Sequence, residues 1–363
     1  MSQFEARLGC MADNEQLQQL FSVPQPSLGI QLAFERAPNY FHSEAVMYNS
    51  GELWLVIHSE TRRLAAAVNI GHRWLYVNGV AQWVRYGADM RIAPEFQGSR
   101  ALLYINRAVK HALADDYYLS IILQDNNRSK ESFEHARAGL PSYRKLGEIT
   151  TYTLHSPRFL RYKKPPVRVA TYADIPAMNE FIKKMANHYQ FLPCYDFELL
   201  KTNSDFFQGL TINDFLLLEK DGKICGLVGL WDQKQIKQTK VVSYSNWLKI
   251  ARPFYNLWSS IFGGIKLPQK GGNLAYLTLH SPLTEPCDLA GFEQLLNAAW
   301  KAAKARGFSS IIFTLANEDP RNVSLENYRY NAIHSNHYSV DYNEENQANI
   351  STNYIYYYEC GRN

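Results

Sequence analysis

A short turn between two apolar segments is the part of this sequence best suited to chemistry. Gln97-Gly98-Ser99-Arg100-Ala101 follows Pro94, which ends a strand-like segment, and an amphipathic helix is expected to begin at once. Such a turn directs free backbone N–H groups and a helix N-terminus toward one point, which suits a phosphate group. Arg100 would either supply a charge to that phosphate or obstruct it. The turn therefore predicts an anion-binding loop.

The segments around this turn predict a unit of strand, turn, helix and strand. Residues 82–92 alternate in polarity, and one face is expected to carry Val84, Tyr86, Ala88, Met90 and Ile92. After the turn, an apolar stripe at helical spacing comprises Leu102, Ile105, Val109 and Ala112. Residues 118–123 then predict a short apolar strand. A crossover of this kind places its anion site at the carboxyl end of the first strand.

The order of these features resembles the GCN5-related N-acetyltransferases (GNAT), which bind acetyl-CoA, over about residues 4–154. The family's loop pattern is Gln/Arg-x-x-Gly-x-Gly/Ala; Gln97 matches it, whereas Arg100 and Leu102 depart from it. The resemblance implies that residues 97–101 hold the pyrophosphate of the cofactor. It also implies that backbone N–H groups of Met90, Arg91 and Ile92 steady the carbonyl oxygen as negative charge develops there.

Two further points of the resemblance follow the second strand. The family often carries an Asn at this position, where the chain has Asn126 and Asn127, and then a Tyr-x-Lys-Leu-Gly segment, here residues 143–147. The resemblance implies that Asn126 or Asn127 contacts the pantetheine arm of the cofactor or orders water. Tyr143 would act as the general acid that protonates the departing thiolate.

An internal repeat organises the chain. Residues 7–13 (RLGCMAD) parallel residues 168–174 (RVATYAD), and Asp13 and Asp174 are each expected to cap a helix. A hairpin is expected in both copies, from residues 53–57 with 65–68 and from 215–218 with 226–229. Helix, hairpin, strand, helix and strand follow in the same order in both halves. We therefore expect an α+β protein of two tandem GNAT-like domains, each a mixed, mostly antiparallel sheet flanked by helices, with a splayed parallel pair at its centre.

The expected division is an N-terminal domain of residues 1–160 with the acyl-CoA loop, a linker of residues 161–166, and a C-terminal domain of residues 167–363. The loop of the second copy, residues 281–288, has no glycine and two acidic residues, so it predicts a copy that has lost cofactor binding. An aromatic insertion near residues 233–271 belongs to the second half only. Packing between the domains is its expected role, with a lid, a substrate wall or a membrane-surface contact as alternatives.

The composition narrows the class of protein. The 363 residues are 46% hydrophobic and 20% charged, and a net charge of +4 is too weak to argue for nucleic acid. Five scattered cysteines indicate a reducing compartment, and with no signal peptide or membrane span visible we expect a cytoplasmic location. No metal-binding pattern is present, so no metal is expected. A dimer is compatible with the sequence.

These observations predict an acyl-CoA-dependent N-acyltransferase, with acetyl-CoA or another acyl-CoA as cosubstrate and a small-molecule or peptide amine as acceptor. The amine would attack the thioester directly in the first domain. One alternative is a catalytically decayed GNAT fold that serves as a binding or scaffold protein, which Arg100 favours. Another is an aminoacyl transferase, against which the modest charge and the absence of a long helical-hairpin pattern count.

Overall fold

The computed structural model describes residues 3–24, 29–114, 116–125, 140–158, 167–343 and 349–363. The elements of the first half are β1 (Phe4–Leu8), α1 (Asn14–Phe21), β2 (Ile30–Glu35), α2 (Tyr40–Met47), β3 (Leu53–His58), β4 (Leu64–Asn69), β5 (His72–Val77), β6 (Val80–Ile92), α3 (Ala101–Leu113), β7 (Tyr118–Leu123) and β8 (Ser142–Pro157). Those of the second half are β9 (Val167–Val169), α5 (Ile175–Met185), β10 (Tyr189–Gln190), β11 (Leu192–Pro193), β12 (Phe215–Lys220), β13 (Lys223–Trp231), β14 (Gln238–Tyr244), α6 (Asn246–Phe262), β15 (Leu277–Thr284), α7 (Leu289–Ala305), β16 (Ile311–Ala316), β17 (Tyr328–Asp341) and β18 (Ile355–Tyr356).

The internal repeat is confirmed down to individual contacts. Arg7 forms two hydrogen bonds to the Asp13 carboxylate, 2.8 and 2.6 Å long, and Arg168 forms two of the same lengths to Asp174. In both copies the carboxylate closes a short 3₁₀ turn by accepting the N–H of the residue three positions earlier. Asp13 and Asp174 hold the N-cap positions of α1 and α5 as expected, but neither side chain bonds to its helix, because the arginine and the turn engage both carboxylate oxygens.

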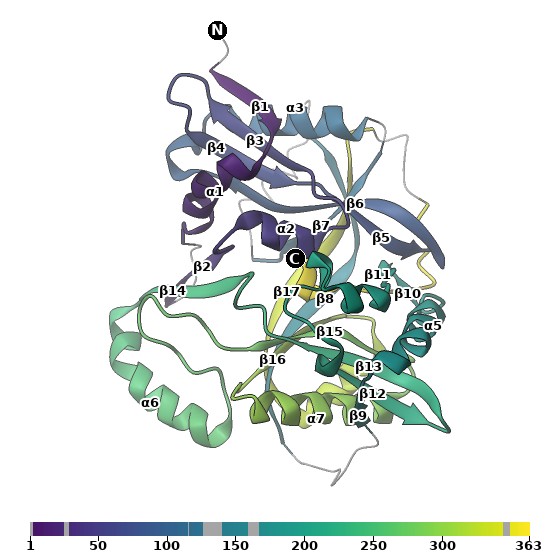
Figure 1. The fold of residues 1–363 in the computed structure, drawn as a ribbon. Coiled ribbons are helices and arrows are strands. Elements are labelled where there is room, and N and C mark those ends of the chain that lie inside the picture. The colour runs from purple at the N-terminus through teal and green to yellow at the C-terminus, as the bar shows by residue number, and fades with distance from the viewer. Residues whose placement is uncertain (1–2, 25–28, 115, 126–139, 159–166, 344–348) are drawn as a thin grey trace.

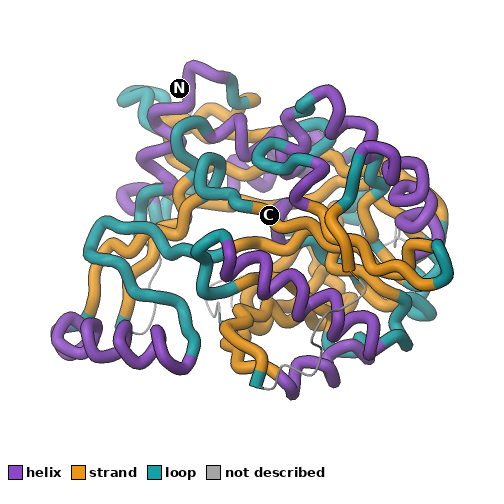
Figure 2. Tube along the Cα trace, turned by 60° about the horizontal axis from the view of Figure 1, so that its bottom comes forward, coloured by secondary structure: helices purple, strands orange, loops and turns teal. Residues whose placement is uncertain are grey.

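Each half contains the expected hairpin and the expected splayed parallel pair. β3 pairs with β4, and β12 pairs with β13, in antiparallel ladders. β6 runs parallel to β7 only at residues 85–87, and β15 runs parallel to β16 only at residues 277–278. Beyond these few residues the strands diverge. Apolar clusters place α3 on one face of the first half's strands with α1 and α2 on the other, and α7 and α5 cover the two faces of the second half (Figures 1 and 2).

A β-bulge interrupts β6 and corrects the predicted face of that strand. Asp89 has a φ of 58°, and the register with β4 shifts at this point. Val84 and Tyr86 lie in the core as expected, but Met90 is 42% exposed. Ile92 packs in the cluster beneath α3, on the opposite side of the sheet from Tyr86. Because a bulge adds one residue to a strand, it inverts the alternation beyond it.

The two halves exchange their last long strands. The central part of the sheet has the order β6-β7-β17-β8-β16-β15, so β17 of the second half lies beside β7, and β8 of the first half lies beside β16 (Figure 1). The strands β8 and β17 also pair with each other along almost their whole length. One continuous sheet therefore runs through both halves. The predicted linker, residues 161–166, lies outside the described residues, and the division of the chain at that point stays a prediction.

Candidate active site

The turn between β6 and α3 has the geometry of an anion-binding loop. Gly98 has a φ of 77°, which a side chain would strain, and the space around its Cα is open. The Ser99 hydroxyl accepts the N–H of Ala101 at 3.2 Å and so satisfies one of the first donors of α3. The backbone N–H groups of Gly98, Arg100 and Leu102 have no acceptor within the described parts of the chain. Residues 97–101 are thus brought together at the N-terminus of α3, where the N–H groups of Gly98, Arg100 and Leu102 can bind a ligand.

Arg100 does not distort this turn. Its φ of −74° and ψ of 0° are ordinary for any residue, so the glycine that the GNAT pattern has here is not required by the backbone. The Arg100 side chain is exposed, as is that of Gln97. No carboxylate among the described residues forms an ion pair with Arg100. Its guanidinium is therefore available to an anion bound at the turn.

The end of β6 supplies backbone groups beside the turn. Ala93 donates its N–H to Ala65 of β4 at 2.9 Å, and Arg91 lies opposite Ala67 of the same strand. By alternation, the N–H groups of Met90 and Ile92 point to the other edge of β6, the one that β7 leaves after Gly87. The backbone of Arg91 faces β4 instead. Two of the three residues named from the sequence thus border the gap between the diverging strands.

A buried polar network lies at the bulge, on the face of β6 opposite α3. The carboxylate of Asp89 accepts a hydrogen bond from Arg36 at 2.7 Å and one from the Tyr40 hydroxyl at 3.2 Å. Asn69 links the Tyr40 hydroxyl to Glu44, whose pKa is raised by burial. The sequence does not indicate the roles of Arg36 and Tyr40, because only tertiary packing brings the end of β2 and the start of α2 to the bulge. Arg36 and Tyr40 thus each engage one carboxylate oxygen of Asp89.

The structure does not bring Tyr143 to the turn. Tyr143 lies half-buried in β8, edge-on to Tyr338 of β17 with 5.8 Å between the ring centroids, and burial raises its pKa. Its side chain interacts with that of Tyr118 in β7, which lies opposite Arg85 in the ladder between β6 and β7. The Arg85 guanidinium donates to the carbonyl of Ala112 near the end of α3. A 13-residue helix spans about 20 Å, so Tyr143 lies toward the far end of α3. Its role stays a prediction, and Asn126 and Asn127 lie outside the described residues.

In the second half, the chain itself occupies the corresponding gap. β15 also has a residue of positive φ, Ser281, and its N–H donates to Glu359 at 2.7 Å. The next residue, Cys360, interacts with Thr314 of β16, so residues 359–360 bridge the two diverging strands. At the start of α7, the Asp288 carboxylate accepts the N–H of Gly291 at 3.0 Å, so an acidic side chain already lies at the N-terminus of this helix.

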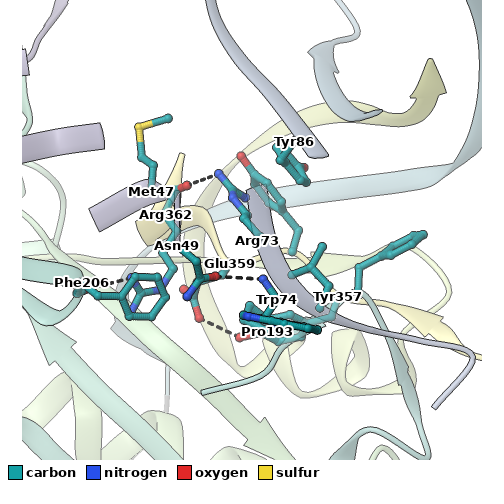
Figure 3. A pocket seen from close by; sticks show the side chains of 13 residues that line it. Met47, Asn49, Arg73, Trp74, Tyr86, Pro193, Phe206, Tyr357, Glu359 and Arg362 are labelled. Carbon is teal, nitrogen blue, oxygen red and sulfur yellow. Dashed lines mark hydrogen bonds between the residues drawn. The ribbon is translucent and has the colours of Figure 1, made fainter. Parts of the chain in front are cut away.

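Residues of the same C-terminal segment line a small pocket between the two halves (Figure 3). Arg73 and Tyr86 line it from the first half, and Phe206 and Arg362 line it from the second. Arg73 lies over the Tyr86 ring at 3.9 Å and donates to the carbonyl of Arg362 at 2.5 Å. The guanidinium of Arg362 lies over Phe206 at 3.6 Å and donates to the carbonyls of Val46 and Phe206. These contacts join the halves on the face of β6 opposite α3.

Together, the splayed parallel pairs, the bulge, the turn at Gly98 and the tandem repeat define the GNAT fold in two copies. The chain resembles the crystal structure of a GCN5-related N-acetyltransferase from Sphaerobacter thermophilus, with a TM-score of 0.57 and 14% identity over 93% of this chain and 96% of that one. It also resembles Saccharomyces cerevisiae N-myristoyltransferase with bound myristoyl-CoA, with a TM-score of 0.61 and 12% identity over 99% of this chain and 86% of that one. No protein-family model and no curated protein sequence matches it.

Two negative findings concern the described residues only. They contain no cluster of three or more His, Cys, Asp or Glu side chains placed to hold a metal ion. Among the same residues, no helix combines the length and the apolar character needed to cross a bilayer.

Proposed function

We propose that the protein is an acyl-CoA-dependent N-acyltransferase with one cofactor site, in the first half. The observation that carries this proposal is the set of backbone N–H groups of Gly98, Arg100 and Leu102 at the start of α3, which have no acceptor among the described residues. They lie beside the gap where β7 leaves β6. The pyrophosphate of the cofactor would bind at the turn, with Arg100 adding a positive charge. The pantetheine arm would enter between the diverging strands.

The reaction is direct transfer of the acyl group, acetyl in the simplest case. The acceptor nitrogen attacks the thioester carbonyl, the new C–N bond forms, and the C–S bond breaks. The N–H groups of Met90 and Ile92 would hold the oxygen as it gains negative charge. The nitrogen loses a proton and the thiolate of CoA gains one, and the resemblance to the GNAT family implies that Tyr143 donates the second proton. The amine has to arrive neutral or lose its proton through water, since Asp89 is held by Arg36.

The acceptor, a small-molecule or peptide amine, would approach from the face of β6 opposite α3. The network around Asp89 lies on that face, as do the contacts that join the two halves at Tyr86 and Arg362. One cofactor per chain is proposed because Glu359 accepts the N–H of Ser281, and because the carboxylate of Asp288 lies at the N-terminus of α7, where it would repel a phosphate. A cytoplasmic location and a dimer remain predictions.

Isothermal titration calorimetry with CoA and acetyl-CoA tests the proposal. We expect one site per chain, and much weaker binding of pantetheine, which lacks the pyrophosphate. No heat of binding with either cofactor at millimolar concentration would refute a cofactor site. Binding without release of free thiol from acetyl-CoA, over a panel of small and peptide amines, would favour the non-enzymatic alternative, in which the fold binds but does not transfer.

A further inference from the structure

The aromatic insertion forms a lobe at the edge of the molecule. β14 pairs with β2 of the first half in a separate two-stranded sheet, and α6 follows it, apart from the helices that cover the main sheet (Figures 1 and 2). Along α6 runs a stripe of large apolar side chains that are mostly exposed: Trp247 (66%), Ile250 (73%), Phe254 (72%), Leu257 (65%) and Trp258 (49%). Their spacing of three and four residues places them on one side of the helix.

The opposite side of α6 packs against the rest of the protein. Leu248 and Tyr255 pack against the small cluster formed by Val241, Tyr244 and Leu267. Asn256 exchanges two hydrogen bonds with the backbone of Leu267, at 2.9 and 2.8 Å, and Ser259 bonds to the carbonyl of Gly264. The helix is therefore anchored by its inner side. Trp258 of the stripe also contacts this side, with 6.1 Å between its ring and that of Tyr255, but most of the stripe faces outward. An exposed apolar patch of this kind marks an interaction surface.

The charge of the insertion indicates what covers the stripe. From Gln233 to Thr284 the sequence has no Asp or Glu and seven Lys or Arg. Lys234 and Lys240 pair with carboxylates outside this span, Asp232 and Glu35. Lys249, Lys266 and Lys270 are exposed and form no ion pair with any described residue. The apolar stripe is thus accompanied by positive charge that nothing in the described chain compensates.

We propose that α6 is an interfacial helix that binds the protein to an anionic lipid surface. A helix with Trp, Phe and Leu on one side and basic residues nearby lies in the plane of the interface, with its apolar side among the acyl chains. Trp residues at both ends of the stripe fit the boundary between water and hydrocarbon. At 17 residues, α6 lies on a membrane rather than across it. This proposal does not depend on the proposed acyl transfer.

Co-sedimentation with vesicles of phosphatidylcholine, with and without 30% phosphatidylglycerol, tests the proposal. We expect binding to the anionic vesicles, lowered at least about tenfold in Phe254→Glu, because burying such a side chain is worth a factor of that order or more. The matched control is Val323→Glu, which changes another exposed apolar residue (57%) elsewhere and should leave binding unchanged. Lys266→Glu with Lys270→Glu should weaken binding, and added salt should do the same.

Three outcomes would overturn the proposal. One is failure of the wild type to bind either vesicle, and another is equal binding to neutral and anionic vesicles. The third is a dimer in analytical ultracentrifugation that Phe254→Glu dissociates, since the stripe would then be an interface between two copies. Circular dichroism of Phe254→Glu should match the wild type, because this side chain is 72% exposed.

Discussion

Replacement of Arg100 by glutamate offers the sharpest test of the cofactor site. The Arg100 side chain is exposed, so its attraction to a bound pyrophosphate is screened by water. Two unit charges 4 Å apart attract by about 1 kcal/mol in water and about 4 kcal/mol at an effective dielectric constant of 20. Exposure favours the lower figure. Removing the charge should then cost about 1 kcal/mol, and reversing it about 2 kcal/mol, which corresponds to roughly 30-fold in Kd.

Titration calorimetry of CoA into the wild type, Arg100→Gly and Arg100→Glu measures this effect. The glycine variant should bind about fivefold more weakly than the wild type, from the loss of about 1 kcal/mol. The control is Arg107→Glu, an exposed arginine on the same helix about 10 Å farther along its axis, where the effect should be small at physiological salt. Arg100→Glu affinity equal to wild type would refute the phosphate contact. An equal loss in Arg107→Glu would assign it to net charge instead.

Three further outcomes are expected. Tyr143→Phe should lower turnover about 100-fold or more with the Kd for CoA unchanged, if the hydroxyl is the general acid; unchanged turnover would remove Tyr143 from the mechanism. Asp89→Ala leaves the Arg36 guanidinium buried and unpaired, so the free energy of unfolding in urea should fall by about 3–5 kcal/mol, and a loss under about 1 kcal/mol would contradict the network. Arg168 holds the pKa of Asp174 below its ordinary value of 3.8, so this carboxylate stabilises the fold above pH 4 and loses that effect as the pH falls below it. Asp174→Asn should therefore cost about 1 kcal/mol at pH 7, since the pair is partly exposed, and the difference from wild type should shrink toward pH 2 in thermal denaturation.

The features that the sequence predicted correctly depend on local pattern. The repeated Arg and Asp indicated two equivalent turns. Gly98 and the apolar stripe after it predicted the loop and α3. The bulge at Asp89 was beyond prediction because the alternation of residues 82–92 continues through it without a break. The location of Tyr143 also depends on tertiary structure, because β8 pairs with β17, which is far away in the sequence.

The exchange of β8 and β17 constrains how the protein folds as it is synthesised. Until Tyr328–Asp341 leaves the ribosome, β7 and β8 lack the strand that joins them, and the first half has open sheet edges. Such edges pair readily with other chains, and long-range strand pairing is slow. Nearly the whole chain must therefore be synthesised before β17 can pair with β7 and β8 and complete the sheet. Neither half is expected to fold when expressed alone, whereas co-expressed fragments cut between β8 and β9 could assemble.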